Sequence, residues 1–407
     1  MPARATAALT KRFPCLTSSR ARTATSPSSR ITPARTAATT QAGPRSRSSR
    51  KSRSSPPEQV DLSTVRTVSG GSVRVVVDAM GGDHAPLEIV AGTLAWARKH
   101  PADTILLVGI PEAIDRAAGG PLPPNIEVVP ASQVVEMDES PAAALKAKKD
   151  SSILVAMDLL KQGRGDALVT AGHSGAGMAA AVLRLGRLPG VDRPALAVQM
   201  ITDTGPFVLL DIGANVDATG HNLYQFAHMG SLYAERVLGV EKPRIALLSI
   251  GEEKGKGDQA IQQATQLLDD DGSLNFVGNV EGRDLVKHMA DVVVCDAVVG
   301  NVTMKFFEGL AGFIFDLWRR EFRRGIRGPI GYLFMRSGVH RIRETFDYER
   351  MGASPLLGVK GMVLITHGSA KRRMIEFAVE AGATAARANI PELIADAFRG
   401  QPRHPKV

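Results

Sequence analysis

The sequence predicts an α/β fold of three layers, in which helices cover both faces of a mostly parallel sheet. Two patterns support this fold class. Nine short runs of apolar residues have the continuous hydrophobicity of strands that are buried on both faces. Helical patterns separate most of these runs, so that strand, turn and helix alternate along the chain. A hydrophobic content of 44% supplies enough apolar side chains for such a core.

The expected elements begin at Val73, where the composition changes abruptly. Strands are expected at 73–78, 104–109, 126–129, 166–171, 195–201, 207–213, 244–251, 291–296 and 361–368. Helices are expected near 87–99, 141–161, 175–186, 221–238, 257–269, 301–324 and 370–388. In open α/β sheets, ligands bind at the carboxyl ends of strands. The turns that follow these strands are therefore the expected location of a functional site.

The formal net charge of +9 comes from the N-terminal segment. Residues 1–57 hold 12 Lys and Arg and no acidic residue, which leaves 38 basic and 41 acidic side chains in the other 350 residues. The expected folded domain, 71–400, has no net positive field, which argues against nucleic-acid binding. Residues 1–70 are basic and rich in Arg, Ser, Thr, Ala and Pro, and we expect them to be disordered. This composition suits either an organellar transit peptide or a non-structural extension of the chain.

The cysteine content excludes two further classes of protein. Cys15 and Cys295 are too few for a disulfide framework or a cysteine-based zinc site, and they indicate a reducing compartment such as the cytoplasm. Cys295 ends an apolar strand and is expected to pack in the core. No uninterrupted apolar run approaches the roughly 18 residues of a membrane-spanning helix.

Two glycine-rich turns present polar side chains after predicted strands. In DAMGGDHAP, the glycines permit close backbone approach, and Asp83 and His84 face the crevice. This turn matches neither of the glycine-rich nucleotide fingerprints. In TAGHSGAGM, His173 and Ser174 lie at a helix start, where backbone amides and a hydroxyl suit an anion such as phosphate. A nucleophilic serine is the alternative, but the G-x-S-x-G spacing is missing.

Later turns carry further candidates. Asn215 lies in LDIGANVD, where two aspartates and an amide could bind a cation, orient a substrate or only form the turn. Lys256 lies in SIGEEKGKGD, where a lysine in a glycine-rich loop can hold a phosphate, although a charge cluster is more often a solvated loop. Asn301 and Lys305 belong to CDAVVGNVTMK, and NFVGNVEGRD is expected to be another such turn. His367 starts a helix in THGSAKRR, with structural and functional roles equally open.

These segments together carry a family resemblance. The chain resembles the phosphate acyltransferase family of bacterial phospholipid synthesis (PlsX) in the ordered blocks DAMGGDHAP, GRLPGVDRPALA, LDIGANVD, LLSIGEE, NFVGNVEGRD, DVVVCDAVVGNV and MVLITHGS. The colinear match runs from about Val73 to about Ala388. The resemblance implies a homodimer with a phosphotransacetylase-like and isocitrate dehydrogenase-like three-layer fold. The family usually carries Asn-Thr where this chain has His173-Ser174.

The resemblance implies transfer of a fatty acyl group from acyl carrier protein to inorganic phosphate, by a cytoplasmic protein associated peripherally with the membrane. A membrane-bound glycerol-phosphate acyltransferase would then consume the acyl phosphate. This chemistry needs an anion pocket, oxyanion donors and proximity of the two substrates, but no metal or other cofactor. By this resemblance the expected catalytic residues are Lys256, His367 and Asn301. The expected phosphate or substrate ligands are Asp83, His84, His173, Ser174, Asn215 and Lys305.

The segment 306–345 is expected to form a protruding helical hairpin. Apolar residues at helical spacing lead into five arginines, and Gly328-Pro329 is expected to break the helix before an apolar patch. The pattern predicts an apolar tip with a collar of arginines, which suits an anionic membrane surface. The expected membrane contacts are Leu333, Phe334, Arg323 and Arg324. A dimer interface and docking of the acidic carrier protein are the alternatives.

Three other functions stay open. A short-chain phosphotransacetylase would use coenzyme A in place of the carrier protein. An NAD-dependent decarboxylating dehydrogenase of the same broad fold would need a set of metal-binding carboxylates, for which Asp211 and Asp217 are the available pair. A non-enzymatic membrane scaffold would bind lipid without turnover.

Overall fold

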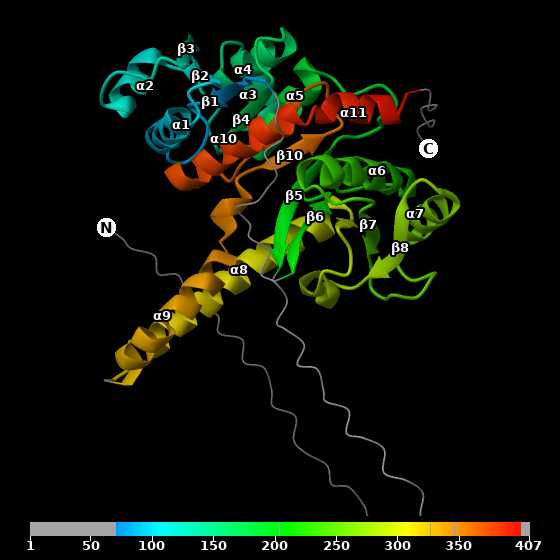
Figure 1. Ribbon diagram of the computed structural model, residues 1–407. Helices are drawn as coiled ribbons and strands as arrows, with labels where there is room; N and C mark the ends of the chain where they lie inside the picture. The colour runs from blue at the N-terminus through cyan, green and yellow to red at the C-terminus, as the bar shows by residue number, and fades with distance from the viewer. Residues whose placement is uncertain (1–70, 203, 326, 346, 400–407) are drawn as a thin grey trace, which may run out of the picture. The chain divides into compact units, whose positions relative to one another are not determined.

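The structure is a computed structural model that describes residues 71–399, apart from 203, 326 and 346. Eleven strands of this part of the chain form one sheet, and helices cover both of its faces (Figure 1). The predicted α/β fold with three layers and a mostly parallel sheet is confirmed. The expectations for the N-terminal 70 residues, disorder or a transit peptide, lie outside the described residues.

The central strands are buried on both faces, as their continuous apolar runs predict. The strands are β1 (Arg74–Asp78), β2 (Thr104–Gly109), β3 (Ile126–Pro130), β4 (Ala167–Thr170), β5 (Ala195–Thr202), β6 (Gly205–Leu210), β7 (Arg244–Leu248), β8 (Asn275–Val280), β9 (Val292–Val294), β10 (Ser354–Leu357) and β11 (Met362–Ile365). The edge strands β3 and β8 are only partly buried. Successive side chains alternate between two cores, so that Val75 and Val77 belong to one and Val76 to the other. Each core needs its own helical layer, which explains the three-layer arrangement.

The helices divide between these two cores. They are α1 (Leu87–Lys99), α2 (Pro111–Ala118), α3 (Pro141–Ala147), α4 (Ser152–Lys161), α5 (Ser174–Arg184), α6 (Gly220–Val237), α7 (Gln259–Asp270), α8 (Ala297–Phe322), α9 (Arg327–Thr345), α10 (Arg372–Arg387) and α11 (Ile390–Ala397), with 3-10 turns η1 (Gly282–Lys287) and η2 (Tyr348–Met351). Helices α1, α6, α7, α10 and α11 cover one face of the sheet. Helices α3, α4 and α5 cover the other face, against which Met304 and Phe307 of α8 also pack.

The sheet consists of two parallel blocks that run in opposite directions. Its strand order is β3-β2-β1-β4-β11-β10-β5-β6-β9-β7-β8. Strand β10 is antiparallel to both β11 and β5, and β5 is antiparallel to β6, whereas the other neighbouring pairs in this sheet are parallel. The carboxyl ends of β1, β4 and β11 therefore lie at one edge of the sheet. Those of β6, β7, β8 and β9 lie at the opposite edge.

Some elements differ from the sequence-based expectation. The predicted helix 141–161 is two helices, α3 and α4, because the chain turns between them and Ser151 pairs with Gln133. The predicted turn in NFVGNVEGRD is instead the edge strand β8, which pairs with β7, followed by η1. The sequence patterns do not predict α2, α11 or β10. Strand β10 is only four residues long and contains Pro355, so its apolar run is too short to recognise.

The predicted hairpin is present, formed by α8 and α9, and extends away from the sheet (Figure 1). The connecting turn contains Arg323 and Arg324, whereas Gly328-Pro329 lies in the first turn of α9, where a proline removes no helical hydrogen bond. The predicted helix break at Gly328-Pro329 is therefore wrong. Arg323 and Arg324 lie in the connecting turn, and exposed apolar side chains follow in the first turns of α9 at Ile330, Leu333 and Phe334. Further exposed apolar side chains lie along α8 at Phe306, Leu310, Phe313 and Leu317.

Helix α8 has the length and composition of a helix that could cross a membrane. It has 26 residues, and its most apolar window has a mean hydropathy of 1.3 and is little buried. A search for uninterrupted apolar runs does not find α8, because the charged residues Lys305, Glu308 and Asp316 lie within the helix. Its first residue is attached to the sheet, since the backbone N–H of Ala297 donates to the carbonyl oxygen of Asn215 at 3.0 Å. The helix therefore starts at the edge of the sheet and leaves it as one arm of the hairpin.

Candidate active site

Three turns at the carboxyl ends of β1, β4 and β11 pack against one another. A Cβ on Gly81 would lie 2.7 Å from the backbone nitrogen of Gly172. Gly82 has a φ of +108°, and its Cβ would lie 3.0 Å from the carbonyl oxygen of Gly368. Both positions therefore require glycine. The backbone N–H of Asp83 donates to the carbonyl of Gly368 at 2.8 Å, which joins the first turn to the third.

Asp78 holds two of these turns together from within the core. Its carboxylate is buried and accepts a hydrogen bond from Thr170 Oγ1 at 2.9 Å and one from the backbone N–H of Met80 at 3.2 Å. Burial raises the pKa of Asp78, and hydrogen bonds from Ser152 and Thr170 oppose this rise. Both carboxylate oxygens are occupied within the protein, so Asp78 positions the turns and does not bind a ligand.

The predicted anion-binding turn surrounds the start of α5. The Nδ1 atom of His173 accepts a hydrogen bond from the backbone N–H of Gly175 at 3.0 Å and thereby caps the helix. A capping Nδ1 leaves the Nε2 atom free to carry the proton and donate to a ligand. Ser174 is exposed beside it, and Asp83 and His84 are exposed on the neighbouring turn. The structure thus brings these four predicted ligands to one edge of the sheet.

His367 lies in the third turn, and α8 brings two charged residues toward it. Ser369 Oγ lies 2.8 Å from His367 Nδ1, which orients the imidazole. Burial raises the pKa of Glu308, while the nearby positive charges of His367 and Lys305 act to lower it. A half-buried carboxyl with a raised pKa beside a histidine and a lysine is a typical acid–base arrangement. We call Lys305, Glu308 and His367 the charged triplet.

The sequence analysis missed Glu308. The sequence could have indicated Glu308 through its position three residues after Lys305, because residues at this spacing lie on the same face of a helix. Its burial could not be recognised, since it depends on how α8 lies against the β11 turn.

Asn215 serves the architecture of the opposite edge. Asp211 is fully buried and accepts hydrogen bonds from the backbone N–H groups of Leu196, Gly213 and Ala214 at 3.0–3.1 Å. The side-chain amide of Asn215 donates to Asp211 Oδ2 and to the carbonyl of Pro194, each at 2.7 Å. Both amide hydrogens of Asn215 are therefore used within the turn, and only its Oδ1 atom remains for a substrate.

The carboxylate pair considered for a metal does not form a metal site. Asp211 is saturated by N–H donors, and Asp217 is exposed and paired with Arg193 at 2.9 Å. Within residues 71–399, outside the three undescribed positions, no group of three or more His, Cys, Asp and Glu side chains could hold a metal ion. These contacts remove the feature that favoured a metal-dependent dehydrogenase.

Helix α8 links the two edges. A Cβ on Gly300 would lie 2.0 Å from the carbonyl oxygen of Asp211, so the first turn of α8 rests directly on the Asp211 backbone. Asn301 follows and is half-buried. Lys305 is one helical turn further on, a rise of about 6 Å. Asn301, Lys305 and Glu308 thus belong to one continuous stretch of α8, and His367 meets them from the turn after β11.

Lys256 lies apart from these residues in the described contacts. It is exposed in the loop after β7, where its backbone N–H donates to the carbonyl of Glu253 at 3.1 Å. Gly255 and Gly257 flank it with φ of +93° and +96°, which fixes the shape of this loop. Among the residues that the structure describes, the contacts recorded for Lys256 stay within its own loop. Its catalytic role stays a prediction.

Comparison with known proteins identifies the family of this chain. Residues 73–393 match a family described as "Fatty acid synthesis protein". The chain belongs to this family. Similar proteins named phosphate acyltransferase include those of Nostoc punctiforme, Heliobacterium modesticaldum and Thermosynechococcus vestitus, with 47%, 45% and 48% identity. The alignments cover 74%, 81% and 79% of this chain and 88%, 98% and 94% of those proteins. The predicted family and enzyme class, an acyltransferase, are confirmed.

Solved structures support the fold. The EutD phosphotransacetylase from Staphylococcus aureus superposes with a TM-score of 0.51 at 16% identity and covers 78% of this chain and 96% of its own. A phosphotransacetylase from Streptococcus pyogenes gives a TM-score of 0.50 at 16% identity, with coverage of 77% and 94%. These comparisons confirm the predicted phosphotransacetylase-like architecture.

Proposed function

We propose that the protein transfers a fatty acyl group from acyl carrier protein to inorganic phosphate. A phosphate oxygen attacks the thioester carbonyl, the C–S bond breaks, and the proton of hydrogen phosphate passes to the carrier thiol. The products are acyl phosphate and free carrier protein. The observation that carries this proposal is the identity of 45–48% with phosphate acyltransferases over most of the chain. The charged triplet beside an amide-lined turn supports it, because such a site can stabilise a phosphate and a developing oxyanion.

Trapping of the product tests the proposal. Acyl carrier protein thioester, phosphate and the full chain are mixed with hydroxylamine, which converts acyl phosphate to a hydroxamate. We expect hydroxamate that depends on both phosphate and enzyme. Product formed from acyl-coenzyme A but not from the carrier thioester would instead identify a phosphotransacetylase, and lipid binding without any product would identify a scaffold.

Within this reaction, we propose that His173, Ser174 and Lys305 bind phosphate and that Asn301 donates to the carbonyl oxygen of the thioester. Asp83 and His84 line the neighbouring turn, and Asn215, whose backbone carbonyl accepts from the N–H of Ala297 at the start of α8, binds substrate through its Oδ1 atom. His367 and Glu308 relay the proton from phosphate to the leaving thiolate. The helix start at His173 and the positive charge of Lys305 support this division of roles.

The raised pKa of Glu308 gives a prediction with a definite sign. A carboxyl whose pKa is raised by burial in the folded state resists ionisation, so its ionisation opposes folding. Glu308→Gln is therefore expected to raise the thermal midpoint at alkaline pH, and this gain should shrink as the pH falls and the carboxyl of the wild-type protein becomes protonated. If Glu308 relays protons, the same variant also loses the pH dependence of kcat. Calorimetry and a pH–rate profile measure the two effects.

Lys256 offers a second prediction. If it holds the phosphate or the transition state, Lys256→Ala lowers kcat/KM by about 100-fold, as expected for the loss of a charged donor. Lys254→Ala is the matched control, because Lys254 lies in the same loop and pairs with Asp269 at 2.9 Å. Near-normal hydroxamate formation by Lys256→Ala would remove Lys256 from the catalytic set.

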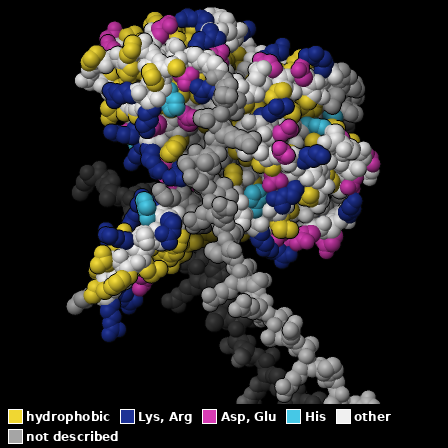
Figure 2. Space-filling model, viewed as in Figure 1, with side chains coloured by type: hydrophobic (Ala, Val, Ile, Leu, Met, Phe, Trp, Pro, Cys, Tyr) yellow, Lys and Arg dark blue, Asp and Glu magenta, His cyan; other side chains and the backbone are white. Residues whose placement is uncertain are grey.

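We propose that the hairpin binds an anionic membrane surface from the cytoplasmic side, where a membrane-bound glycerol-phosphate acyltransferase consumes the acyl phosphate. Figure 2 shows hydrophobic side chains along one edge of the hairpin and basic side chains near its end. Phe334 is 82% exposed and Leu333 is 58% exposed, and Arg323 and Arg324 are exposed at the turn. Apolar groups beside arginines suit the boundary between acyl chains and phosphate headgroups.

Flotation with vesicles tests the membrane proposal. Replacement of Leu333 and Phe334 by serine is expected to abolish flotation with vesicles that contain anionic lipid, while folding is preserved because both side chains are exposed. Unchanged flotation would refute the contact.

We propose further that the chain forms a homodimer through the base of α8. Val298, Val302 and Phe306 are exposed there at a spacing of four residues, which places them on one helix face. Sedimentation of the full chain tests the dimer, and a monomer at micromolar concentration would contradict it.

A further inference from the structure

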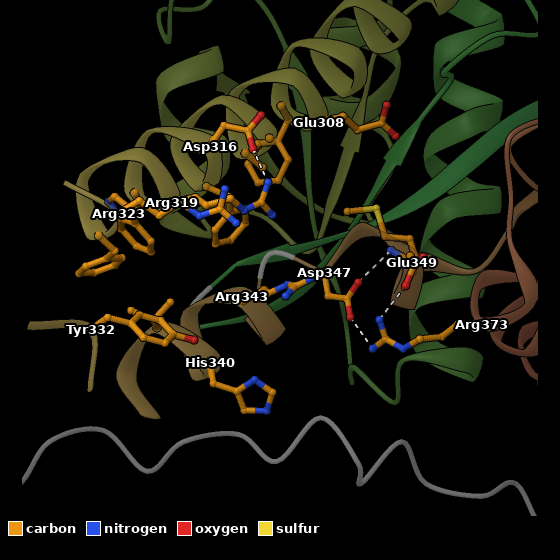
Figure 3. Close-up of a pocket in the computed structure, with 18 of the residues that line it drawn as sticks. Glu308, Asp316, Arg319, Arg323, Tyr332, His340, Arg343, Asp347, Glu349 and Arg373 are labelled. Carbon is orange, nitrogen blue, oxygen red and sulfur yellow. Dashed lines mark hydrogen bonds and ion pairs between the residues drawn. The ribbon is translucent and has the colours of Figure 1, made fainter. Parts of the chain in front are cut away.

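The two arms of the hairpin enclose a large cavity. Helices α8 and α9, together with η2, line a space of about 880 Å³ (Figure 3). Its wall contains the aromatic rings of Phe307, Phe315, Trp318 and Phe322, and Met351. Cavities of this size and apolar character bind organic ligands in other proteins.

Small residues of α8 make the space. Ala311 and Gly312 line the cavity at its centre, and a Cβ on Gly312 would have no atom within 4 Å. A larger residue here can enter this space, because its Cβ meets no neighbouring atom. The open volume therefore depends on the identity of this residue.

The charged residues around the cavity are largely paired with one another. Arg373 contacts Asp347 at 2.5 Å and Glu349 at 2.7 Å, and Arg319 contacts Asp316 at 2.9 Å (Figure 3). These pairs neutralise much of the charge at the rim. The interior accordingly favours an apolar ligand over a polar or charged one.

One end of the cavity reaches the proposed reaction site. Glu308 lines the cavity, and the charges of Lys305 and His367 act on its carboxyl. Figure 3 shows Glu308 on one side of the cavity and Arg323 and Tyr332 on the other. From Glu308 to Phe322, α8 rises about 21 Å at 1.5 Å per residue, roughly the extended length of a 16-carbon chain.

We propose that this cavity holds the fatty acyl chain of the substrate, with the thioester carbonyl beside the charged triplet and the methyl end toward Arg323. The inference rests on the proposed acyl transfer and assigns the part of the site that measures chain length. Each additional methylene group that enters the cavity is removed from contact with water. Binding therefore favours long acyl chains over short ones. The aromatic wall and the paired charges at the rim supply the apolar environment that this selection requires.

Two variants of α8 test the proposal with the full chain. Gly312→Phe fills the cavity, whereas Gly309→Phe is the matched control, because Gly309 lies in the same helix, has no atom within 4 Å of its Cβ and does not line the cavity. We expect Gly312→Phe to lower kcat/KM at least 10-fold for a 16-carbon acyl carrier thioester and less than twofold for an 8-carbon thioester. Gly309→Phe should change neither value by more than twofold.

A binding measurement supplies a readout that needs no turnover. Trp318 lines the cavity, whereas Trp96, the second of the two tryptophans, is buried and donates to Glu380. Dodecyl phosphate, a non-reacting analogue of an acyl phosphate, is expected to change the tryptophan emission of the wild-type chain below its micelle concentration. The change should disappear in Gly312→Phe and Trp318→Phe and persist in Gly309→Phe.

The outcomes separate this inference from the proposed function. The cavity assignment would be overturned if Gly312→Phe kept the wild-type kcat/KM for the 16-carbon thioester. It would also be overturned if the folded variant lost kcat/KM equally for the 16-carbon and the 8-carbon thioester. In both cases the proposed acyl transfer would stand. An emission change that persists in Gly312→Phe would also overturn the cavity assignment. If the wild-type chain forms no acyl phosphate from either thioester, the proposed function fails, and loss of dodecyl phosphate binding in Gly312→Phe still supports an apolar-chain site.

Discussion

Lys305→Ala is expected to lower kcat/KM for phosphate-dependent acyl transfer by about 100-fold or more, and to leave the fold intact. The side chain is exposed and lies in the third turn of α8, where it contributes positive charge near Glu308 and His367. Phosphate and a developing thioester oxyanion are both stabilised by a nearby cation. Since Lys305 is exposed, its removal should not disturb the packing that holds α8 on the sheet.

Lys305→Arg distinguishes charge from geometry. An arginine retains the positive charge but spreads it over a planar fork. We expect this variant to recover part of the phosphate affinity, seen as a lower KM for phosphate than in Lys305→Ala, with kcat still reduced. Arg320→Ala is the matched control for charge at the hairpin, because Arg320 also lies on α8 and is exposed but does not line the cavity. Equal activity of Lys305→Ala and wild type would show that the triplet does not bind phosphate.

The strands could be predicted because local sequence determines them. A run such as TILLVG is apolar at every position, and β2 occupies the same residues, 104–109, as the run. The edge strand β8 carries glycine and asparagine and is only partly buried, so its composition is that of a turn. Local composition identifies strands that are buried on both faces and fails at the edge of the sheet.

The opposite directions of the two blocks could not be predicted. They depend on β10 and β5, which run antiparallel to their neighbours, and β10 comes from a segment far along the chain from β5. Within each block, the candidate residues lie after the carboxyl ends of strands, as the sequence predicts. The sequence could not reveal that Asn215 and Lys256 follow strands of one block, whereas His173 and His367 follow strands of the other.

The hairpin shows the same limit on a smaller scale. The sequence predicts two helices and a surface function, but it places the break at Gly328-Pro329, because a proline usually ends a helix. In the structure the proline begins the second helix, which moves the arginines to the tip. A helix boundary depends on which end of a helix the proline occupies, and composition alone does not decide this.

Gly300→Ala is expected to be the most destabilising single substitution near the site. The new Cβ would lie 2.0 Å from the carbonyl oxygen of Asp211, 2.9 Å from its carbonyl carbon and 3.1 Å from Cys295 Sγ. The first two are backbone atoms at the end of β6 and cannot move without breaking the hydrogen bonds around Asp211. Overpacking of this kind typically costs about 1–3 kcal/mol, and we expect the upper end of that range.

The same substitution should also reduce activity, because Gly300 sets the position of α8. If the first turn of the helix moves away from Asp211, Asn301 and Lys305 move with it. Gly309→Ala is the matched control, since its Cβ would meet no atom within 4 Å and alanine favours the helix by about 0.5–1 kcal/mol. Denaturant unfolding should thus show a loss for Gly300→Ala and a small gain for Gly309→Ala. Wild-type stability of Gly300→Ala would mean that α8 does not rest on the Asp211 backbone, and the link between the two edges of the sheet would be lost.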